Sequence, residues 1–202
     1  VWAPIAGHVR LDGADIDNWH AELLGPHIGY LPQDVELFSG TIAENIARFT
    51  SVDPDAVVKA AQKAGVHDMI LQLADGYNTK IGEGGRSLSG GQRQRIGLAR
   101  ALYGDPKIII LDEPNSSLDS YGEAALAQAL RIAKSEKRTV VVISHRASLL
   151  NEVDKLAVFT NGTLTMYGPA ADVIERLNPR AGTQQPAAQP MGQVTHMTRA
   201  NA

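Results

Sequence analysis

Three neighbouring segments indicate the fold of this chain: Ser87-Leu-Ser-Gly-Gly-Gln-Arg-Gln-Arg95, Ile108-Ile-Ile-Leu-Asp-Glu-Pro114 and Ser116-Ser-Leu-Asp119. The first segment opens a helix with two glycines. The second is a continuous apolar run that ends in acids, which is typical of a buried parallel strand. Strand and helix patterns alternate over residues 104–168, whereas residues 33–100 are almost entirely helical in pattern. This order predicts an α/β fold with a doubly wound sheet.

Turn and capping signals predict the remaining elements. Asp12-Gly13 and Asn161-Gly162 are hairpin turns, and Thr41 begins a capping box. Asp17 is expected to cap a short helix that stops at Gly25-Pro26. Further helices are predicted over residues 54–64, 67–73, 90–103, 120–134, 147–153 and 169–177, and strands over 27–31, 107–111, 139–144, 155–160 and 163–167.

Composition narrows the class of protein. The chain has 202 residues, of which 44% are hydrophobic and 20% charged, as in ordinary globular proteins. A net charge of -3 gives no electrostatic support for nucleic-acid binding, so no nucleic-acid partner is expected. The absence of Cys excludes disulfides and thiolate metal sites. No apolar run approaches the roughly 20 residues of a membrane span.

The segment Leu88-Ser-Gly-Gly-Gln92 is suited to hold a phosphate. The first N–H groups of a helix are unpaired and carry the positive end of its dipole. Two glycines let an anion approach the backbone closely, and Ser89 adds a hydroxyl donor. Taken alone, the segment is also compatible with a Gly-rich helix cap. The adjoining Gln-Arg-Gln-Arg and the acidic strand that follows favour the phosphate site.

Polar side chains follow three predicted strands. Asp112 could hold magnesium through oxygen, and Glu113 could accept a proton from an attacking water. Gln33 follows the strand over residues 27–31 and could ligate magnesium or orient water. His145 follows the strand over 139–144 and could contact a terminal phosphate. Each has an ordinary alternative as a solvated acid, surface amide or packing histidine. A shared position at the carboxyl ends of strands favours function.

Together these residues resemble an ATP-binding cassette, the ATPase domain of ABC transporters. Leu88–Gln92 is similar to the signature motif, Ile108–Glu113 to Walker B with its catalytic glutamate, and Gln33 to the Q-loop. Ser116–Asp119 is similar to the D-loop and His145 to the switch histidine. The resemblance implies a P-loop NTPase-like, RecA-like sheet with an inserted helical signature subdomain. It divides the chain into a cassette over residues 1–177, with a helical subdomain at 33–100 and a core at 101–177, and a disordered tail at 178–202.

The resemblance also implies cofactors and partners, ATP and Mg²⁺ among them. In the family two cassettes sandwich ATP head to tail. Ser89, Gly90, Gly91 and Gln92 would then hold the phosphate bound to the partner, and Asp119 would signal across a homodimer. Asp112 and Gln33 would attend magnesium, while Glu113 and His145 would act on the transferring group.

A finer resemblance is to exporters. The stretches Ile28–Ile46 and Ile81–Ser87 are similar to exporter cassettes, with Glu83 and Val35–Phe38 facing a transmembrane domain. The resemblance is strongest to the ATPase/permease of bacterial type I secretion, at the cytoplasmic face of the inner membrane. It implies a transmembrane domain upstream, a periplasmic adaptor and an outer-membrane channel. Lipid and drug exporters are the nearest alternatives. A soluble ABC ATPase of DNA repair or translation is disfavoured.

One motif of the family is missing. The chain contains no Gly-Lys dipeptide and therefore no G-x-x-x-x-G-K-[ST] phosphate loop. We expect the first strand, the Walker A loop and its helix to be absent, the neighbouring strands to expose apolar faces, and the chain alone to be inactive. The alternative is a truncated, catalytically dead cassette that only binds another subunit.

Overall fold

The structure is a computed structural model, which describes residues 4–85, 87–146 and 149–177. The chain divides into two compact units between Glu152 and Val153. The predicted tail at 178–202 lies outside the described residues. No helix within the described ranges has the length and hydropathy needed to span a bilayer.

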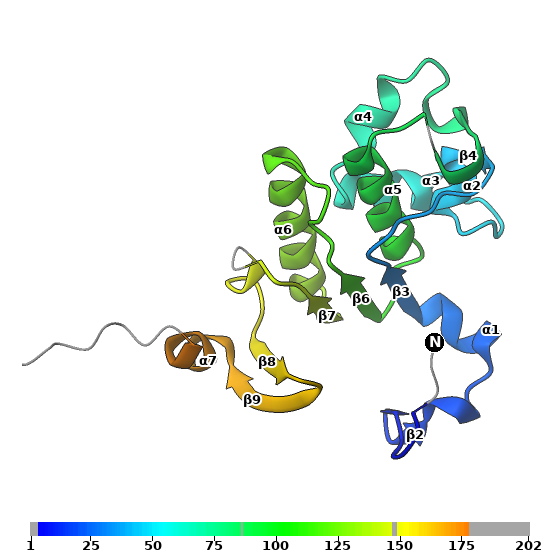
Figure 1. The fold of residues 1–202 in the computed structure, drawn as a ribbon. Helices are drawn as coiled ribbons and strands as arrows, with labels where there is room; N and C mark the ends of the chain where they lie inside the picture. The colour runs from blue at the N-terminus through cyan, green and yellow to red at the C-terminus, as the bar shows by residue number, and fades with distance from the viewer. Residues whose placement is uncertain (1–3, 86, 147–148, 178–202) are drawn as a thin grey trace, which may run out of the picture. The chain divides into compact units, whose positions relative to one another are not determined.

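The first unit is built around a parallel sheet (Figure 1). Strands β3 (Ile28–Leu31), β6 (Ile108–Asp112) and β7 (Thr139–Ile143) pair in the order β3-β6-β7, with Leu31 opposite Leu111 and Asp112 opposite Ile143. The predicted P-loop NTPase-like α/β fold has this parallel arrangement, in which the carboxyl ends of all three strands lie at one edge.

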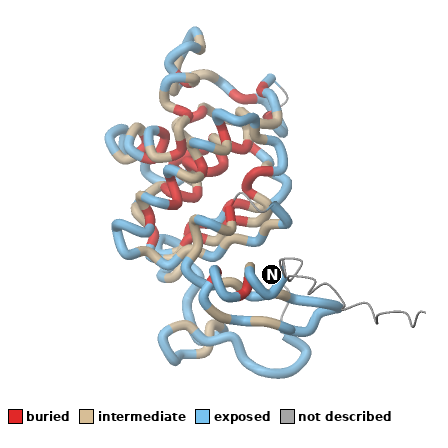
Figure 2. The backbone as a smooth tube through the Cα atoms, turned by 90° about the vertical axis from the view of Figure 1, so that its left-hand side faces the viewer, coloured by how far each residue is buried: buried red, intermediate tan, exposed pale blue. Residues whose placement is uncertain are grey.

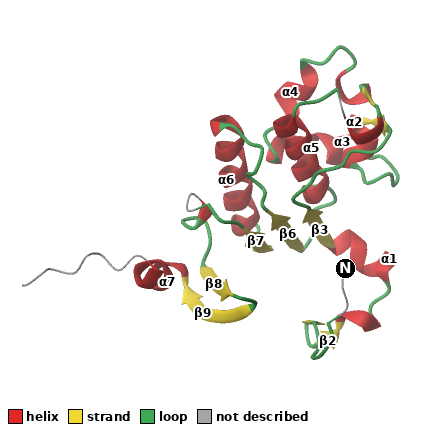
Figure 3. Cartoon of the chain, viewed as in Figure 1, coloured by secondary structure: helices red, strands yellow, loops and turns green. Residues whose placement is uncertain are grey.

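Helices α5 (Gly90–Leu102) and α6 (Ser120–Ser135) cover one face of the sheet in this unit (Figure 3). Helix α5 contacts β3, and α6 contacts β7. The other helices are α1 (Ala21–Leu24), α2 (Ile42–Ile46), α3 (Pro54–Lys63) and α4 (His67–Leu71), with 3₁₀ turns η1 (Ile16–Asn18), η2 (Gly25–His27), η3 (Gly76–Asn78) and η4 (Glu83–Gly85). Two short antiparallel pairs are β1 (Arg10–Leu11) with β2 (Ala14–Asp15), and β4 (Gly40–Thr41) with β5 (Lys80–Ile81).

The hydrophobic core joins buried residues of the sheet with buried residues of its helices, and Figure 2 marks where buried residues lie along the backbone. Leu31, Ile109 and Leu111 of the sheet are at most 1% exposed. The opposite face of the sheet is open, because Tyr30, Val141 and Ile143 are 52%, 47% and 51% exposed. The apolar pattern of β6 and β7 predicts cover on both faces, and the described residues cover only one. The expected exposure of apolar sheet residues is confirmed.

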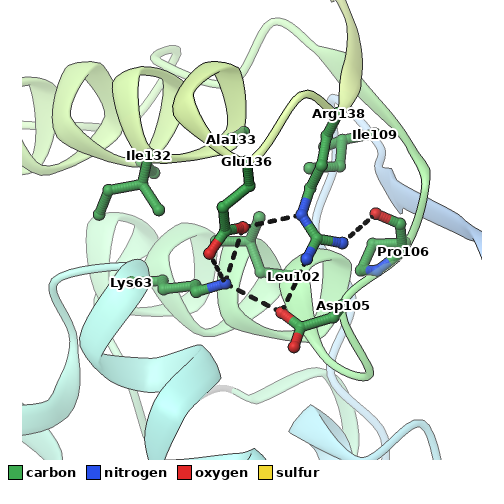
Figure 4. A pocket seen from close by; sticks show the side chains of 10 residues that line it. Lys63, Leu102, Asp105, Pro106, Ile109, Ile132, Ala133, Glu136 and Arg138 are labelled. Carbon is green, nitrogen blue, oxygen red and sulfur yellow. Dashed lines mark hydrogen bonds and ion pairs between the residues drawn. The ribbon is translucent and has the colours of Figure 1, made fainter.

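The helical part and the sheet are joined by ion pairs (Figure 4). Lys63 of α3 lies 2.9 Å from Asp105 and 2.8 Å from Glu136, which follows α6. Arg138 pairs with the same two acids and donates to the carbonyl of Pro106. Burial alone would raise the pKa of Asp105, but hydrogen bonds and charge from Lys59 and Lys63 lower it to about 2.

The second unit contains a hairpin and a helix. Strands β8 (Lys155–Thr160) and β9 (Thr163–Pro169) are antiparallel, and α7 (Ala170–Leu177) packs on them. Asn161 and Gly162 have φ values of 50° and 75°. Both are left-handed, as the predicted two-residue hairpin turn requires.

Two local predictions are wrong. Asp15, rather than Asp17, caps the first short helix, and this segment breaks into η1, α1 and η2. The helix expected over 147–153 is not formed by residues 149–153, where Glu152 N–H donates to Leu149 in a tight i+3 turn. Its first two residues lie outside the described ranges.

Candidate functional site

The parallel sheet brings four predicted site residues to one edge. Asp112 is the last residue of β6, and Glu113 follows it directly. Gln33 lies just beyond β3, and His145 lies just beyond β7. Parallel pairing of the three strands is the reason, since it places all their carboxyl ends together.

Glu113 occupies an unusual position at this edge. Its φ is 45°, in the left-handed region that non-glycine residues rarely adopt. Its N–H donates to the carbonyl of Ile143 at 2.8 Å, so the backbone is tied to β7. Its Oε1 atom is buried and has no hydrogen-bond partner among the described residues. A carboxylate oxygen with unused acceptor capacity is suited to receive a proton.

His145 approaches this free oxygen. Its Nε2 lies 3.2 Å from Glu113 Oε1, which is ion-pair distance, although the two groups are not aligned as a hydrogen bond. The geometry therefore gives a close polar contact without a hydrogen bond. The His145 side chain is 93% exposed, so it is open to a ligand on its solvent side.

Asp112 and Gln33 are the other two site residues at this edge of the sheet, and they do not form a full set of metal ligands. Asp112 is partly buried and Gln33 is exposed. Within the described part of the chain, no three His, Asp or Glu side chains gather closely enough to hold a metal ion. Magnesium is usually bound through one or two carboxylates, waters and substrate phosphates, so a single carboxylate with a neighbouring amide fits it.

The predicted phosphate-binding segment forms the start of α5. Ser89 caps the helix in a reciprocal pair: its Oγ accepts from Gln92 N–H at 3.2 Å, and Gln92 Oε1 accepts from Ser89 N–H at 2.8 Å. Two side chains predicted to touch phosphate therefore also stabilise the helix end. The Gln92 N–H is used by this cap, and the N–H groups of Gly90 and Gly91 are the ones left for an anion.

Gly90 and Gly91 lie against the Ser116–Asp119 segment. A Cβ at Gly91 would be 3.0 Å from the carbonyl oxygen of Ser117, and one at Gly90 would be 3.4 Å from Ser117 Cβ. Asp119 caps α6 by accepting from Gly122 N–H at 2.7 Å. Its carboxylate is thus engaged within the chain, and the predicted signalling role stays a prediction.

Gln94 is a polar residue of this region that sequence reasoning missed. It is 3% exposed. Its Nε2 donates to Glu113 O and to Ser116 Oγ, both at 3.1 Å, and its Oε1 accepts from Ser117 N–H at 2.8 Å. A signal was present: Gln94 precedes Gly97, Leu98 and Ala101 at helical spacing, so it interrupts a buried apolar stripe.

The loop that carries Gln33 is held by two more residues that sequence reasoning missed. Arg100 of α5 donates to Glu36 O at 2.9 Å, and burial followed by the charge of Arg48 lowers its pKa. Asn45 is fully buried and clamps Phe38 by accepting from its N–H and donating to its carbonyl, both at 2.9 Å. Phe38 itself is 58% exposed.

The Glu83 segment packs against α5 and the loop after β3, because a Cβ at Gly85 would be 3.2 Å from Arg93 Cδ and from Leu37 Cδ1. Glu83 is exposed and begins the 3₁₀ turn η4, where Gly84 and Gly85 have φ values of 69° and 63°. Its predicted contact with a transmembrane domain is not tested by the structure of this chain.

The residues present fit part of a nucleotide site. The unpartnered Glu113 oxygen beside Asp112 fits a hydrolytic centre with magnesium, and the α5 N-terminus fits a phosphate. The Walker A sequence, which in such sites cradles the phosphates of the chain's own nucleotide, does not occur in this sequence. The geometry therefore corresponds to two incomplete parts of a nucleotide site, one at the sheet edge and one at the α5 N-terminus. We call these two parts half-sites.

Comparisons with known proteins agree with this geometry. Residues 2–116 match the model of the family described as ABC transporter. The "Type I secretion system ATP-binding protein PrsD" of Rhizobium meliloti is 51% identical over 175 residues, covering 86% of this chain and 30% of that protein. The "Leptomycin B resistance protein pmd1" of Schizosaccharomyces pombe is 40% identical over 172 residues, covering 84% of this chain and 13% of that protein.

A solved structure is similar as well. The structure of a bacterial Atm1-family ABC exporter with ATP bound aligns with a TM-score of 0.79 and 34% identity. The alignment covers 87% of this chain and 31% of that one. The chain thus spans less than a third of the length of each of these three proteins.

Proposed function

The chain belongs to the ABC transporter family, and from that premise we propose that it is the ATP-hydrolysing cassette of a membrane exporter. The observation that carries the proposal is the free, buried oxygen of Glu113 at the sheet edge shared with Asp112, Gln33 and His145. Positioning and electrostatic stabilisation supply most of the catalysis in phosphoryl transfer, and this edge offers both.

Each residue at the edge has a proposed task. Glu113 accepts a proton from the attacking water at its unpartnered Oε1. His145, 3.2 Å away, orients this carboxylate and faces the transferring phosphate with its exposed side. Asp112 and Gln33 would hold magnesium, which supplies charge neutralisation of the phosphates when bound.

The second half of the site lies at the α5 N-terminus. We propose that Ser89, Gly90, Gly91 and Gln92 contact the terminal phosphate of ATP held by a second cassette in a head-to-tail homodimer. The N-terminal N–H groups of α5, and its freedom from acidic residues in the first turn, support an anion there. Asp119 would then couple the two cassettes.

The exported cargo is proposed from similarity. Identity of 51% with a type I secretion ATP-binding protein supports protein export at the cytoplasmic face of a bacterial inner membrane. A transmembrane domain in the same protein, a periplasmic adaptor and an outer-membrane channel would be its partners. The 40% identity with a drug-resistance protein keeps a lipid or drug exporter as the second candidate.

A binding module without catalysis is the alternative function. The sequence feature that favours it is the missing G-x-x-x-x-G-K-[ST] loop, without which the phosphates lose several charge-assisted hydrogen bonds. At about 1.5–3 kcal/mol each, such losses lower nucleotide affinity by more than about a thousandfold. We therefore propose that residues 1–202 alone have negligible ATPase activity.

The test is made in the full-length protein in lipid. Glu113→Gln should abolish magnesium-dependent ATP hydrolysis while ATP binding persists, because the amide keeps the shape but cannot accept the proton. Glu22→Gln, at an exposed residue of α1, is the matched control and should leave hydrolysis unchanged. Hydrolysis that survives Glu113→Gln would contradict the proposal. Robust turnover by residues 1–202 alone would contradict the claim of inactivity.

A further inference from the structure

We propose that Gln94 is a positioning residue that couples the phosphate-binding end of α5 to the backbone of Glu113. The inference rests on the proposed ATPase function and assigns to it a residue that lies in neither half-site. Gln94 would act through Glu113 and Ser117 and would touch neither ATP nor water.

The side-chain amide of Gln94 uses its full donor capacity. Both Nε2 hydrogens are engaged, by Glu113 O and Ser116 Oγ, and Oε1 accepts from Ser117 N–H. A backbone carbonyl can only accept and a backbone N–H can only donate, so this pattern fixes which end of the amide faces which partner. With 3% exposure, water cannot replace these bonds. The amide is therefore held rigidly by three buried hydrogen bonds and is not a surface contact.

The backbone of Glu113 needs hydrogen bonds of this kind to hold it, because it is in the left-handed region, with a φ of 45°. Non-glycine residues hold this conformation only where the surroundings impose it. Ile143 O holds the Glu113 N–H at 2.8 Å, and Gln94 holds the Glu113 carbonyl at 3.1 Å. The peptide units on both sides of the Glu113 Cα are thus fixed, which aims its carboxylate.

Gln94 also connects Glu113 to the half-site at the α5 N-terminus. Gln94 lies early in α5, whose N-cap is Ser89 and whose Gly91 approaches the carbonyl of Ser117. A helix moves as a rigid body over such a short length. Any shift of the α5 N-terminus on meeting a partner's phosphate would therefore reach Glu113 and Ser117 through the Gln94 amide.

The test compares kcat and KM for ATP in the full-length protein in lipid. Gln94→Met keeps the side-chain length and removes all three hydrogen bonds. Gln62→Met, at an exposed residue of α3, is the matched control. We expect Gln94→Met to lower kcat by about 10- to 100-fold, as misplacement of a reacting group does. KM should change by less than about threefold, because the bonds do not serve substrate binding.

A second variant gives a readout that a purely structural role would not move. Gln94→Glu keeps the acceptor for Ser117 N–H, but the ionised carboxylate cannot donate to Glu113 O. Burial favours its protonated form, which can donate. The ratio of its kcat to the wild-type kcat should therefore rise as pH falls from about 9 to about 6, because a buried Glu takes up its proton near roughly pH 8–9.

The outcomes separate the two proposals. If Glu113→Gln abolishes hydrolysis but Gln94→Met behaves like Gln62→Met, the role of Gln94 is wrong and the ATPase function stands. If Gln94→Met does not fold, the Gln94→Glu ratio decides, and a ratio that is flat with pH overturns the inference. If Glu113→Gln retains hydrolysis, the proposed function itself fails.

Discussion

Replacing Gly29 by Ala is the sharpest test of how this fold is packed. Gly29 lies in the middle of β3, directly beneath α5. A Cβ built there would be 1.9 Å from the carbonyl oxygen of Ala101 and 3.1 Å from Pro106 Cγ. Real Cβ atoms essentially never come within 3.0 Å of another heavy atom, so β3 and α5 would have to separate by at least 1.1 Å, the difference between the two distances.

The expected loss of unfolding free energy has two contributions. Forcing an extra carbon into a packed core costs about 1–3 kcal/mol. The Ala101 carbonyl also accepts from Arg48 Nη2 at 3.2 Å, and losing a hydrogen bond from a charged donor costs about 1.5 kcal/mol or more. The sum is about 2.5–4.5 kcal/mol of unfolding free energy, or about 10 °C in Tm for a domain of this size.

The assay is thermal and urea unfolding of the purified protein, with Gly82→Ala as the control. Gly82 is exposed, its φ lies outside the left-handed region, and a Cβ built there would meet no heavy atom within 4 Å. Its replacement should change stability by no more than about 0.5 kcal/mol. Equal Tm values for the two variants would refute the close approach of α5 to β3.

Three further predictions concern polar side chains that hold parts of the fold together. Arg48 donates its five N–H groups to five backbone carbonyls. The variant Arg48→Lys has only three donors, so its unfolding free energy in urea should fall by about 2–4 kcal/mol. An unchanged urea midpoint would contradict this. Asn45→Ala should leave the Phe38 backbone without its clamp, cost about 2–3 kcal/mol, and speed limited proteolysis within residues 33–39, whereas the exposed control Gln62→Ala should not. The pKa of Asp105 is about 2, below its ordinary 3.8, so its stabilisation is full above about pH 4 and is lost as pH falls towards 2. Asp105→Asn should cost about 1 kcal/mol at pH 7, since partial exposure weakens the pairs, and should flatten the loss of stability between pH 4 and 2. A wild-type acid unfolding curve that Asp105→Asn does not alter would count against the ion pairs.

The wrong and missed predictions concern features that a local residue pattern does not specify. Asp15 rather than Asp17 caps the first short helix, because which carboxylate reaches an N–H depends on where the preceding hairpin ends. The β4–β5 pair was missed because two-residue strands give no alternation to detect. The open face of β3 and β7 shows that an apolar run predicts burial without saying what buries it.

Features that depend on a local residue pattern can be predicted from the amino-acid sequence. Continuous apolar runs predict parallel strands, and parallel strands bring their carboxyl ends together, so the gathering of Gln33, Asp112, Glu113 and His145 at one edge was predictable. The capping boxes at Thr41 and Ser89 were likewise encoded within a few residues.

The long-range hydrogen bonds, in contrast, become visible only in the folded chain. Arg48 reaches carbonyls on both β3 and α5, and Gln94 reaches the backbone of Glu113 and Ser117. These partners are distant in sequence, and a hydrogen bond forms only within about 3 Å and a narrow range of angles. No residue pattern specifies such a meeting, because it depends on how helix and sheet pack once the core has formed.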